Sequence, residues 1–219
     1  MSKCENFQKF LALSEEKRER IINAAMKEFL IGYKNASTDN IVREAGISKG
    51  LLFHYFGSKE RLYNFLIDYG IEIMQREYID LINIIQPDVL ESVWQLSLLK
   101  QDLSNKYPDI FDFMASALID TSAKSESVTA NLAKFNEVRA GILKDVYAHA
   151  DVSLFRDDIE PMQAMQIISW ALDGYGRSKV SMAPAENLGK LGEIARQNYD
   201  LYLEEFQQIL NTLRKCFYK

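Results

Sequence analysis

The 219-residue sequence contains little cysteine and histidine, and it has no long apolar run. Its two cysteines, Cys4 and Cys216, stand at opposite ends, which excludes a disulfide framework and a cysteine-based metal motif and favours a reducing, cytoplasmic location. His54 and His149 add too few ligands for a structural zinc site, so we expect neither a metal nor a cofactor. No apolar stretch approaches the ~20 residues that span a bilayer, so we expect no membrane partner. The N-terminus lacks the apolar segment of a secretory signal.

Sequence motifs of enzymes are missing as well. The chain shows no Ser/His/Asp or Cys/His order, no paired-carboxylate signature, no HExxH, no glycine-rich phosphate loop and no dinucleotide fingerprint. His149 lies in a stretch rich in apolar residues and is expected to be structural. The sequence therefore predicts a protein that is not an enzyme.

Charge is distributed unevenly along the chain, although the formal net charge is only −5. Residues 1–60 carry 10 basic and 8 acidic side chains, a net charge of +2. Residues 61–219 carry the remaining 16 basic and 23 acidic side chains, a net charge of −7. The change of sign suggests two regions with different partners.

The secondary-structure pattern indicates an all-α protein. The sequence has four prolines, none of them in the first 86 residues, and apolar residues recur at helical rather than strand spacing. Helix starts are predicted at Ser14, Ser37, Ser48 and Ser58, and glycines close the first three helices. Further helical stretches are predicted over residues 88–104, 108–120, 126–150, 159–180 and 187–217.

Residues 37–60 indicate a helix-turn-helix. The turn Gly46-Ile47-Ser48 joins two short helices, and its glycine can adopt a positive φ. A small core is expected from apolar positions that share one side: Phe29, Ile41, Ala45, Ile47, Leu52 and Phe56. The opposite arc of the second helix then faces outward with Gly50, Leu51, Phe53 and His54, a composition that favours an occluded contact such as a DNA major groove. Ser48, Lys49, Tyr55 and Lys59 flank this arc as donors suited to phosphate, with backbone N–H groups at the helix starts of Ser37 and Ser48.

The segment GISKGLLFHYFGSKERLY, with Gly32-Tyr33 and Ser37 before it, resembles the DNA-binding domain of TetR-type transcriptional regulators over about residues 10–66. The resemblance implies a helix-turn-helix domain, here residues 1–60, and a helical ligand-binding and dimerisation domain, here residues 61–219. It places phosphate contacts on Ser37, Thr38, Lys49, Tyr55 and Lys59, and base contacts on Lys49, Gly50, Leu51, Phe53 and His54. The sequence departs from the family pattern at three positions. Asp39 stands where a basic or polar residue is common, Leu51 where Thr is frequent, and Phe53 where Tyr is common.

Simpler interpretations of these residues stay open. A grouping of Ser, Lys and Tyr side chains is often only a solvated face, and His54 is equally explained as a surface histidine. Tyr55 could pack at the base of the following helix. A helical adaptor whose helix-turn-helix has lost DNA binding is the alternative function, since Asp39 and Phe53 weaken the case for a DNA contact.

The C-terminal two thirds predict a dimer. Residues 161–180 are apolar nearly all round, and residues 187–217 carry a long apolar stripe, so the last two helices are expected to pack against those of a second copy. An intrachain core in a monomer is the alternative. A pocket for an unknown small-molecule effector is expected among apolar side chains of the middle helices, although core packing explains each one as well: Met74, Trp94, Leu98, Phe111, Met114, Leu118, Phe135, Val138, Ile142 and Trp170.

These observations together predict a ligand-responsive transcriptional regulator. It would act as a repressor that binds palindromic double-stranded operator DNA as a homodimer, since a two-fold dimer presents two recognition helices about 34–36 Å apart. A small molecule that binds better to a misaligned state would release the DNA.

Overall fold

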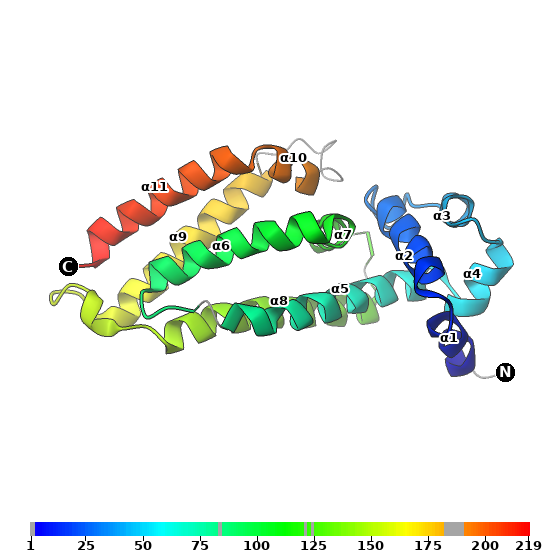
Figure 1. The fold of residues 1–219 in the computed structure, drawn as a ribbon, viewed down its shortest axis with the longest axis horizontal. Coiled ribbons are helices and arrows are strands. Elements are labelled where there is room, and N and C mark those ends of the chain that lie inside the picture. The colour runs from blue at the N-terminus through cyan, green and yellow to red at the C-terminus, as the bar shows by residue number, and fades with distance from the viewer. Residues whose placement is uncertain (1–2, 83–84, 121, 124, 182–190) are drawn as a thin grey trace.

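A computed structural model describes residues 3–82, 85–120, 122–123, 125–181 and 191–219. Within these ranges the chain is helical, and its only β-type pairing there is one bridge between Phe155 and Tyr218, which confirms the all-α prediction. A short 3-10 helix spans Val152–Leu154. The α-helices are α1 (Lys3–Leu11), α2 (Glu15–Phe29), α3 (Thr38–Ala45), α4 (Lys49–Phe56), α5 (Lys59–Ile82), α6 (Val89–Lys106), α7 (Pro108–Ile119), α8 (Glu126–Ala148), α9 (Pro161–Ser181), α10 (Leu191–Gln197) and α11 (Tyr199–Phe217) (Figure 1).

The helices of the N-terminal domain begin and end where the capping residues predict. The hydroxyl of Ser37 accepts the N–H of Asp39 at 3.2 Å, and that of Ser48 accepts the N–H of Leu51 at 3.2 Å. Gly46 closes α3 with φ +64°, a left-handed conformation that L side chains rarely adopt. Local sequence alone therefore fixes the turn between α3 and α4.

Two helical features differ from the sequence prediction. Helix α1 is absent from the prediction, and it forms because Phe7 and Phe10 bury one side of it against the N-terminal domain. The predicted stretch 187–217 is two helices, α10 and α11, which meet at Asn198. Residues 187–190 of that stretch lie outside the described residues.

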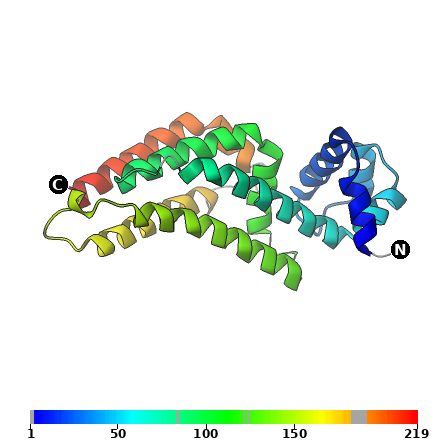
Figure 2. The same cartoon turned by 60° about the horizontal axis from the view of Figure 1, so that its bottom comes forward.

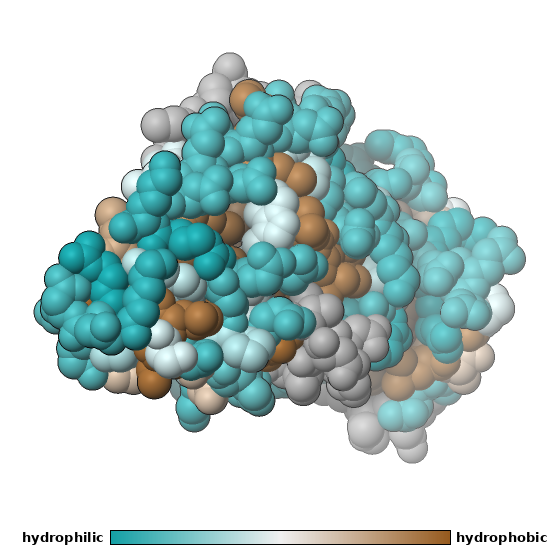
Figure 3. Space-filling view, turned by 60° about the vertical axis from the view of Figure 1, so that its left-hand side comes forward, coloured by the Kyte–Doolittle hydropathy of each residue, from teal (hydrophilic) through white to brown (hydrophobic). Residues whose placement is uncertain are grey.

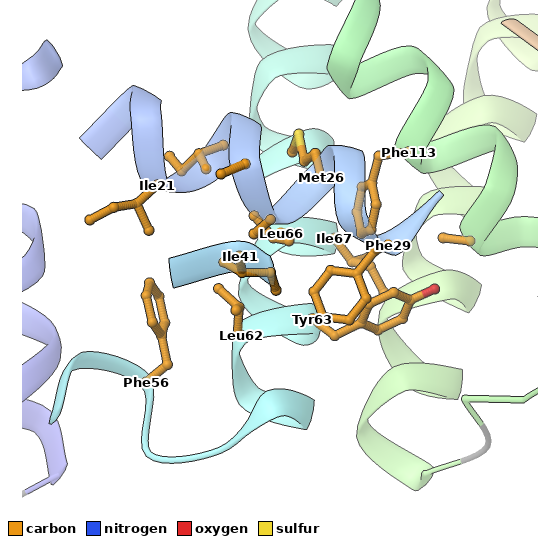
Figure 4. Packing of buried hydrophobic residues seen from close by; sticks show 14 of the residues in the cluster. Ile21, Met26, Phe29, Ile41, Phe56, Leu62, Tyr63, Leu66, Ile67 and Phe113 are labelled. Atoms are coloured by element: carbon orange, nitrogen blue, oxygen red, sulfur yellow. The ribbon is translucent and has the colours of Figure 1, made fainter. Parts of the chain in front are cut away.

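One apolar cluster holds the N-terminal domain on the rest of the chain. It takes side chains from α1 to α5 and from α7 and α8. Tyr63 of α5 packs against both Phe29 of α2 and Phe113 of α7, with ring centroids 4.9 and 5.4 Å away (Figure 4). The predicted domain boundary after residue 60 falls at the start of α5, and since this cluster extends across it, the division into 1–60 and 61–219 stays a prediction.

A second apolar cluster fills the other end of the molecule, between α6, α8, α9 and α11. The long helix α5 runs from the N-terminal domain into this region, so the molecule is elongated (Figure 2). Asp88 ties the C-terminus to the start of α6, because it caps α6, pairs with Arg214 at 2.6 Å and accepts the Tyr218 hydroxyl at 3.0 Å.

Candidate DNA-binding site

Helix α4 presents two different faces. Leu52 and Phe56 are buried in the first cluster, as predicted, while Lys49 and Gly50 are exposed. Arg20 of α2 donates from Nε to the carbonyl of Ala45 at 3.0 Å, and this hydrogen bond attaches the end of α3, which precedes α4, to α2. The outward face of α4 is therefore a fixed surface.

The predicted contact residues lie mainly along this face and at the start of α3. Ser48, Lys49 and Gly50 are exposed, and the others are half-buried: Ser37, Thr38, Leu51, Phe53 and His54. Gly50 leaves open space, because a Cβ placed there would meet no atom nearer than the Ser48 hydroxyl at 4.0 Å. A base edge or phosphate can approach the backbone closely at this point.

Lys49 pairs with Asp39 across the two helices. The Lys49 Nζ lies 2.9 Å from each oxygen of the Asp39 carboxylate, and the two side chains are 50% and 68% exposed. The contact brings the start of α3 next to the start of α4. The sequence marks Asp39 only as a departure from a family pattern and does not predict this pair.

Two of the predicted phosphate donors have contacts inside the protein. The Tyr55 side chain is only 8% exposed, and its ring packs on Phe10 of α1 with centroids 5.7 Å apart. Lys59 donates from Nζ to the carbonyl of Ala36 at 2.6 Å and lies over the Tyr33 ring. Burial lowers the pKa of Lys59, and the nearby Glu28 carboxylate partly opposes that shift.

The loop after α2 is linked to the segment after α7, a feature that sequence reasoning misses. The backbone N–H of Tyr33 donates to the Asp120 carboxylate at 2.6 Å, and that of Lys34 donates to the Ser122 hydroxyl at 3.2 Å. Burial alone would raise the pKa of Asp120, but hydrogen bonds from Ser122 and from the Tyr33 N–H outweigh it, so the pKa is lowered. Gly32 (φ +89°) permits the turn that aims these N–H groups. The only sequence signal is the Gly32-Tyr33 break.

The predicted pocket residues are divided between different parts of the molecule. Met74, Met114, Phe135 and Val138 belong to or pack on the first cluster, whereas Trp94 packs on the second. Leu98, Phe111 and Ile142 are half-buried. Leu118 and Trp170 lie on the surface with 36% and 63% exposure, so their place in a pocket stays a prediction.

A small cavity adjoins the Asp120 link. Its volume is about 80 Å³, and it is lined by Tyr33, Glu60, Ala123, Ser125 and Val128, none of which is among the predicted pocket walls. Pockets for drug-sized ligands measure about 300–1,000 Å³, so this cavity is too small for such an effector.

Comparison with known families supports the interpretation of the N-terminal domain. Residues 21–65, which run from α2 into α5 and include α3 and α4, match the family model described as bacterial regulatory proteins, tetR family. This helix-turn-helix segment is therefore similar to that of TetR-family regulators. No curated protein matches the chain significantly in sequence.

Solved structures of bacterial regulators share the fold over most of the chain. A TetR family transcriptional regulator from Chloroflexus aurantiacus J-10-FL is 21% identical, with a TM-score of 0.61 over 97% of this chain and 98% of that one. A putative fatty acid metabolism regulator from Clostridium perfringens is 23% identical, with a TM-score of 0.51 over 82% and 95%. The regulator FadR from Bacillus subtilis, solved with stearoyl-CoA, is 15% identical, with a TM-score of 0.55 over 89% and 96%. No helix among the described residues is long and apolar enough to cross a membrane.

Proposed function

We propose that this TetR-type protein represses transcription by binding palindromic operator DNA as a homodimer, and that a small molecule releases it. The observation that carries the proposal is the outward face of α4 on a TetR-family domain. Leu52 and Phe56 anchor the helix inward, and this leaves Lys49, Gly50 and His54 available to a duplex. A recognition helix of this kind reads bases in the major groove.

Exposed apolar side chains on α9 and α11 support the homodimer. Met162, Trp170 and Leu201 are each more than half exposed, which is costly for large apolar groups in a monomer. The two helices run in opposite directions and meet at Tyr175, which packs on Phe206 and donates its hydroxyl to Glu205 (Figure 1). Figure 3 shows apolar side chains exposed among hydrophilic ones on the face at the C-terminal end. A second copy would cover the apolar surface of α9 and α11.

The link at Asp120 supports a route from the C-terminal region to the DNA. It ties the end of α7 to the loop that precedes α3, so a ligand that moves α7 also moves the helix-turn-helix. A ligand with unequal affinity for the two arrangements would change DNA affinity by about 5–150-fold. Stearoyl-CoA, bound in the Bacillus subtilis structure, is a reasonable first effector to test.

One observation favours the alternative of a helical adaptor that binds protein instead of DNA. Lys59 and Tyr55, two of the five expected phosphate contacts, are engaged inside the chain. Fewer free donors would weaken the electrostatic part of DNA binding.

Gel-shift titration with DNA from upstream of the chain's own gene separates the two functions. The repressor predicts saturable complexes that unlabelled upstream DNA displaces and unrelated DNA of equal length does not. Addition of stearoyl-CoA should then release the DNA if it is the effector. Equal competition by both DNAs, or no complex at low salt, would contradict the repressor and favour the adaptor.

A further inference from the structure

Asp39 and Lys49 place an acceptor and a donor side by side at the edge of the recognition face. Both oxygens of the Asp39 carboxylate lie 2.9 Å from the Lys49 Nζ, and both side chains are at least half exposed. Asp39 is the second residue of α3 and Lys49 the first residue of α4, so the pair spans the two helices of the motif. The carboxylate therefore accompanies α4 into any contact that the start of this helix makes.

The surroundings leave this pair open to a partner. Gly50 follows Lys49 and contributes no side chain. Arg43, the basic residue one helical turn after Asp39, is held instead by the side-chain oxygen of Asn40 at 2.9 Å. Among the contacts described for Asp39, Lys49 is therefore its basic partner.

The Asp39 carboxylate disfavours a contact of Lys49 with a DNA phosphate and favours a contact with a base pair. A phosphate would have to take Lys49 from Asp39 while it approached a carboxylate of the same charge, so phosphate binding there is unfavourable. In the major groove, guanine presents two acceptors, O6 and N7, and its partner cytosine presents a donor, the N4 amino group. An ammonium beside a carboxylate complements that order of acceptor and donor.

We propose that Asp39 is a specificity-determining residue that reads a G·C pair together with Lys49. The Lys49 ammonium donates two of its N–H groups to guanine O6 and N7 and keeps the third on one oxygen of Asp39, while the other oxygen of this carboxylate accepts from cytosine N4. The pair also suppresses binding to DNA that lacks a G·C pair at this position, because Lys49 is not free for a phosphate. This inference rests on the proposed function, since it specifies how the same surface selects its operator.

Selection of binding sites from randomised duplexes tests the proposal with the wild type, Asp39→Ala and Asp39→Asn. The wild type should select a G·C pair at one position of each half-site, with a preference of about 5- to 150-fold. Asp39→Ala should weaken that preference and keep the others, because the contact to cytosine N4 is lost and Lys49 becomes free for a phosphate. Asp39→Asn should shift it towards A·T, because an amide pairs with adenine N6 and N7. Glu44→Gln removes the same charge from an exposed position of α3 and should leave the selected sequence unchanged.

Salt titrations on a random duplex provide a second readout. Freeing Lys49 in Asp39→Ala should tighten binding to random DNA and steepen the salt dependence by about one per subunit. Glu44→Gln should not change the slope. An identical selected sequence in all variants, or an unchanged slope in Asp39→Ala, would overturn the role of Asp39 while selective binding by the wild type still supported the repressor. A wild type that selects no sequence would contradict both.

Discussion

The two ends of the molecule use their aromatic residues in opposite ways. In the N-terminal domain Phe10 makes ring contacts with Tyr55, Phe56 and Phe65 and has no exposed surface. At the other end, Trp170 of α9 is 63% exposed, although buried residues of the same helix belong to the second cluster. The N-terminal domain therefore completes its core within one chain, whereas α9 leaves a large apolar side chain exposed.

The buried aromatic core of the N-terminal domain and the exposed Trp170 of α9 suit two different requirements. A domain with a closed core can present a fixed surface, which a reader of DNA needs. A region that exposes large apolar side chains gains stability when a second copy covers them, so its stability depends on assembly. Breaking each region in turn should therefore give different results, loss of folding in the first and loss of assembly in the second.

The largest effect is expected from Phe10→Ala. The side chain is fully buried among aromatic rings, so its removal should lower the free energy of unfolding by about 3–5 kcal/mol. Chemical denaturation followed by circular dichroism measures the change. Leu11→Ala, at the adjacent and 40% exposed position, is the control and should have a much smaller effect. Equal losses for both variants would mean that α1 does not belong to the core.

Trp170→Ala should affect assembly rather than folding. Aromatic residues at the centre of an interface contribute about 2 kcal/mol or more, so the dimer dissociation constant should rise about 30-fold or more. Sedimentation equilibrium measures this constant, and denaturation checks that each subunit remains folded. Val152→Ala, an exposed apolar position outside α9 and α11, should leave the dimer intact. A dimer unaffected by the substitution of Trp170 would contradict the proposed interface.

Lys59→Met tests whether this lysine acts inside the domain. Removal of its hydrogen bond to the Ala36 carbonyl should reduce stability by about 1–2 kcal/mol, since the donor is charged. The salt dependence of DNA binding should change little in this variant. In the Asp39→Ala background, by contrast, where Lys49 is free to bind a phosphate, the further change Lys49→Met should lower the slope by about one per subunit. Lys34→Met at a neighbouring exposed position is the stability control. A flatter salt slope with unchanged stability would restore Lys59 to the phosphate contacts.

Sequence alone is sufficient where the physical cause is local. Serine caps and Gly46 determine the ends of α3, and the spacing of Leu52 and Phe56 determines which side of α4 is buried. These features depend on residues within one turn of each other, so a single sequence contains them. The helix-turn-helix is correctly predicted for that reason.

Features that depend on distant parts of the chain are not predictable in this way. Asp120 and Tyr33 are 87 residues apart, and neither marks the other as a partner. The exposed side of α9 cannot be assigned either, because apolar residues occupy most of its sides, so the sequence does not show that Trp170 is exposed. The contact of Lys59 cannot be predicted from sequence, because the same ammonium group can bind either a phosphate or a backbone carbonyl.

The smallest effect is expected at the link between the two regions. Because the pKa of Asp120 in the folded protein lies below its ordinary value of 3.8, the ionised carboxylate stabilises the fold above that pH. The contribution is lost as the pH falls through the lower, folded-state pKa. Asp120→Asn should therefore be less stable than the wild type by less than about 1 kcal/mol at neutral pH, since the group is partly solvated, and the two should converge below pH ~3. Denaturation at a series of pH values measures the difference. Ser122→Ala removes both the acceptor of the Lys34 N–H and a hydroxyl donor to Asp120, so only part of its deficit should disappear at low pH. A constant difference between Asp120→Asn and the wild type at every pH would show that the charge of Asp120 does not hold the helix-turn-helix to α7.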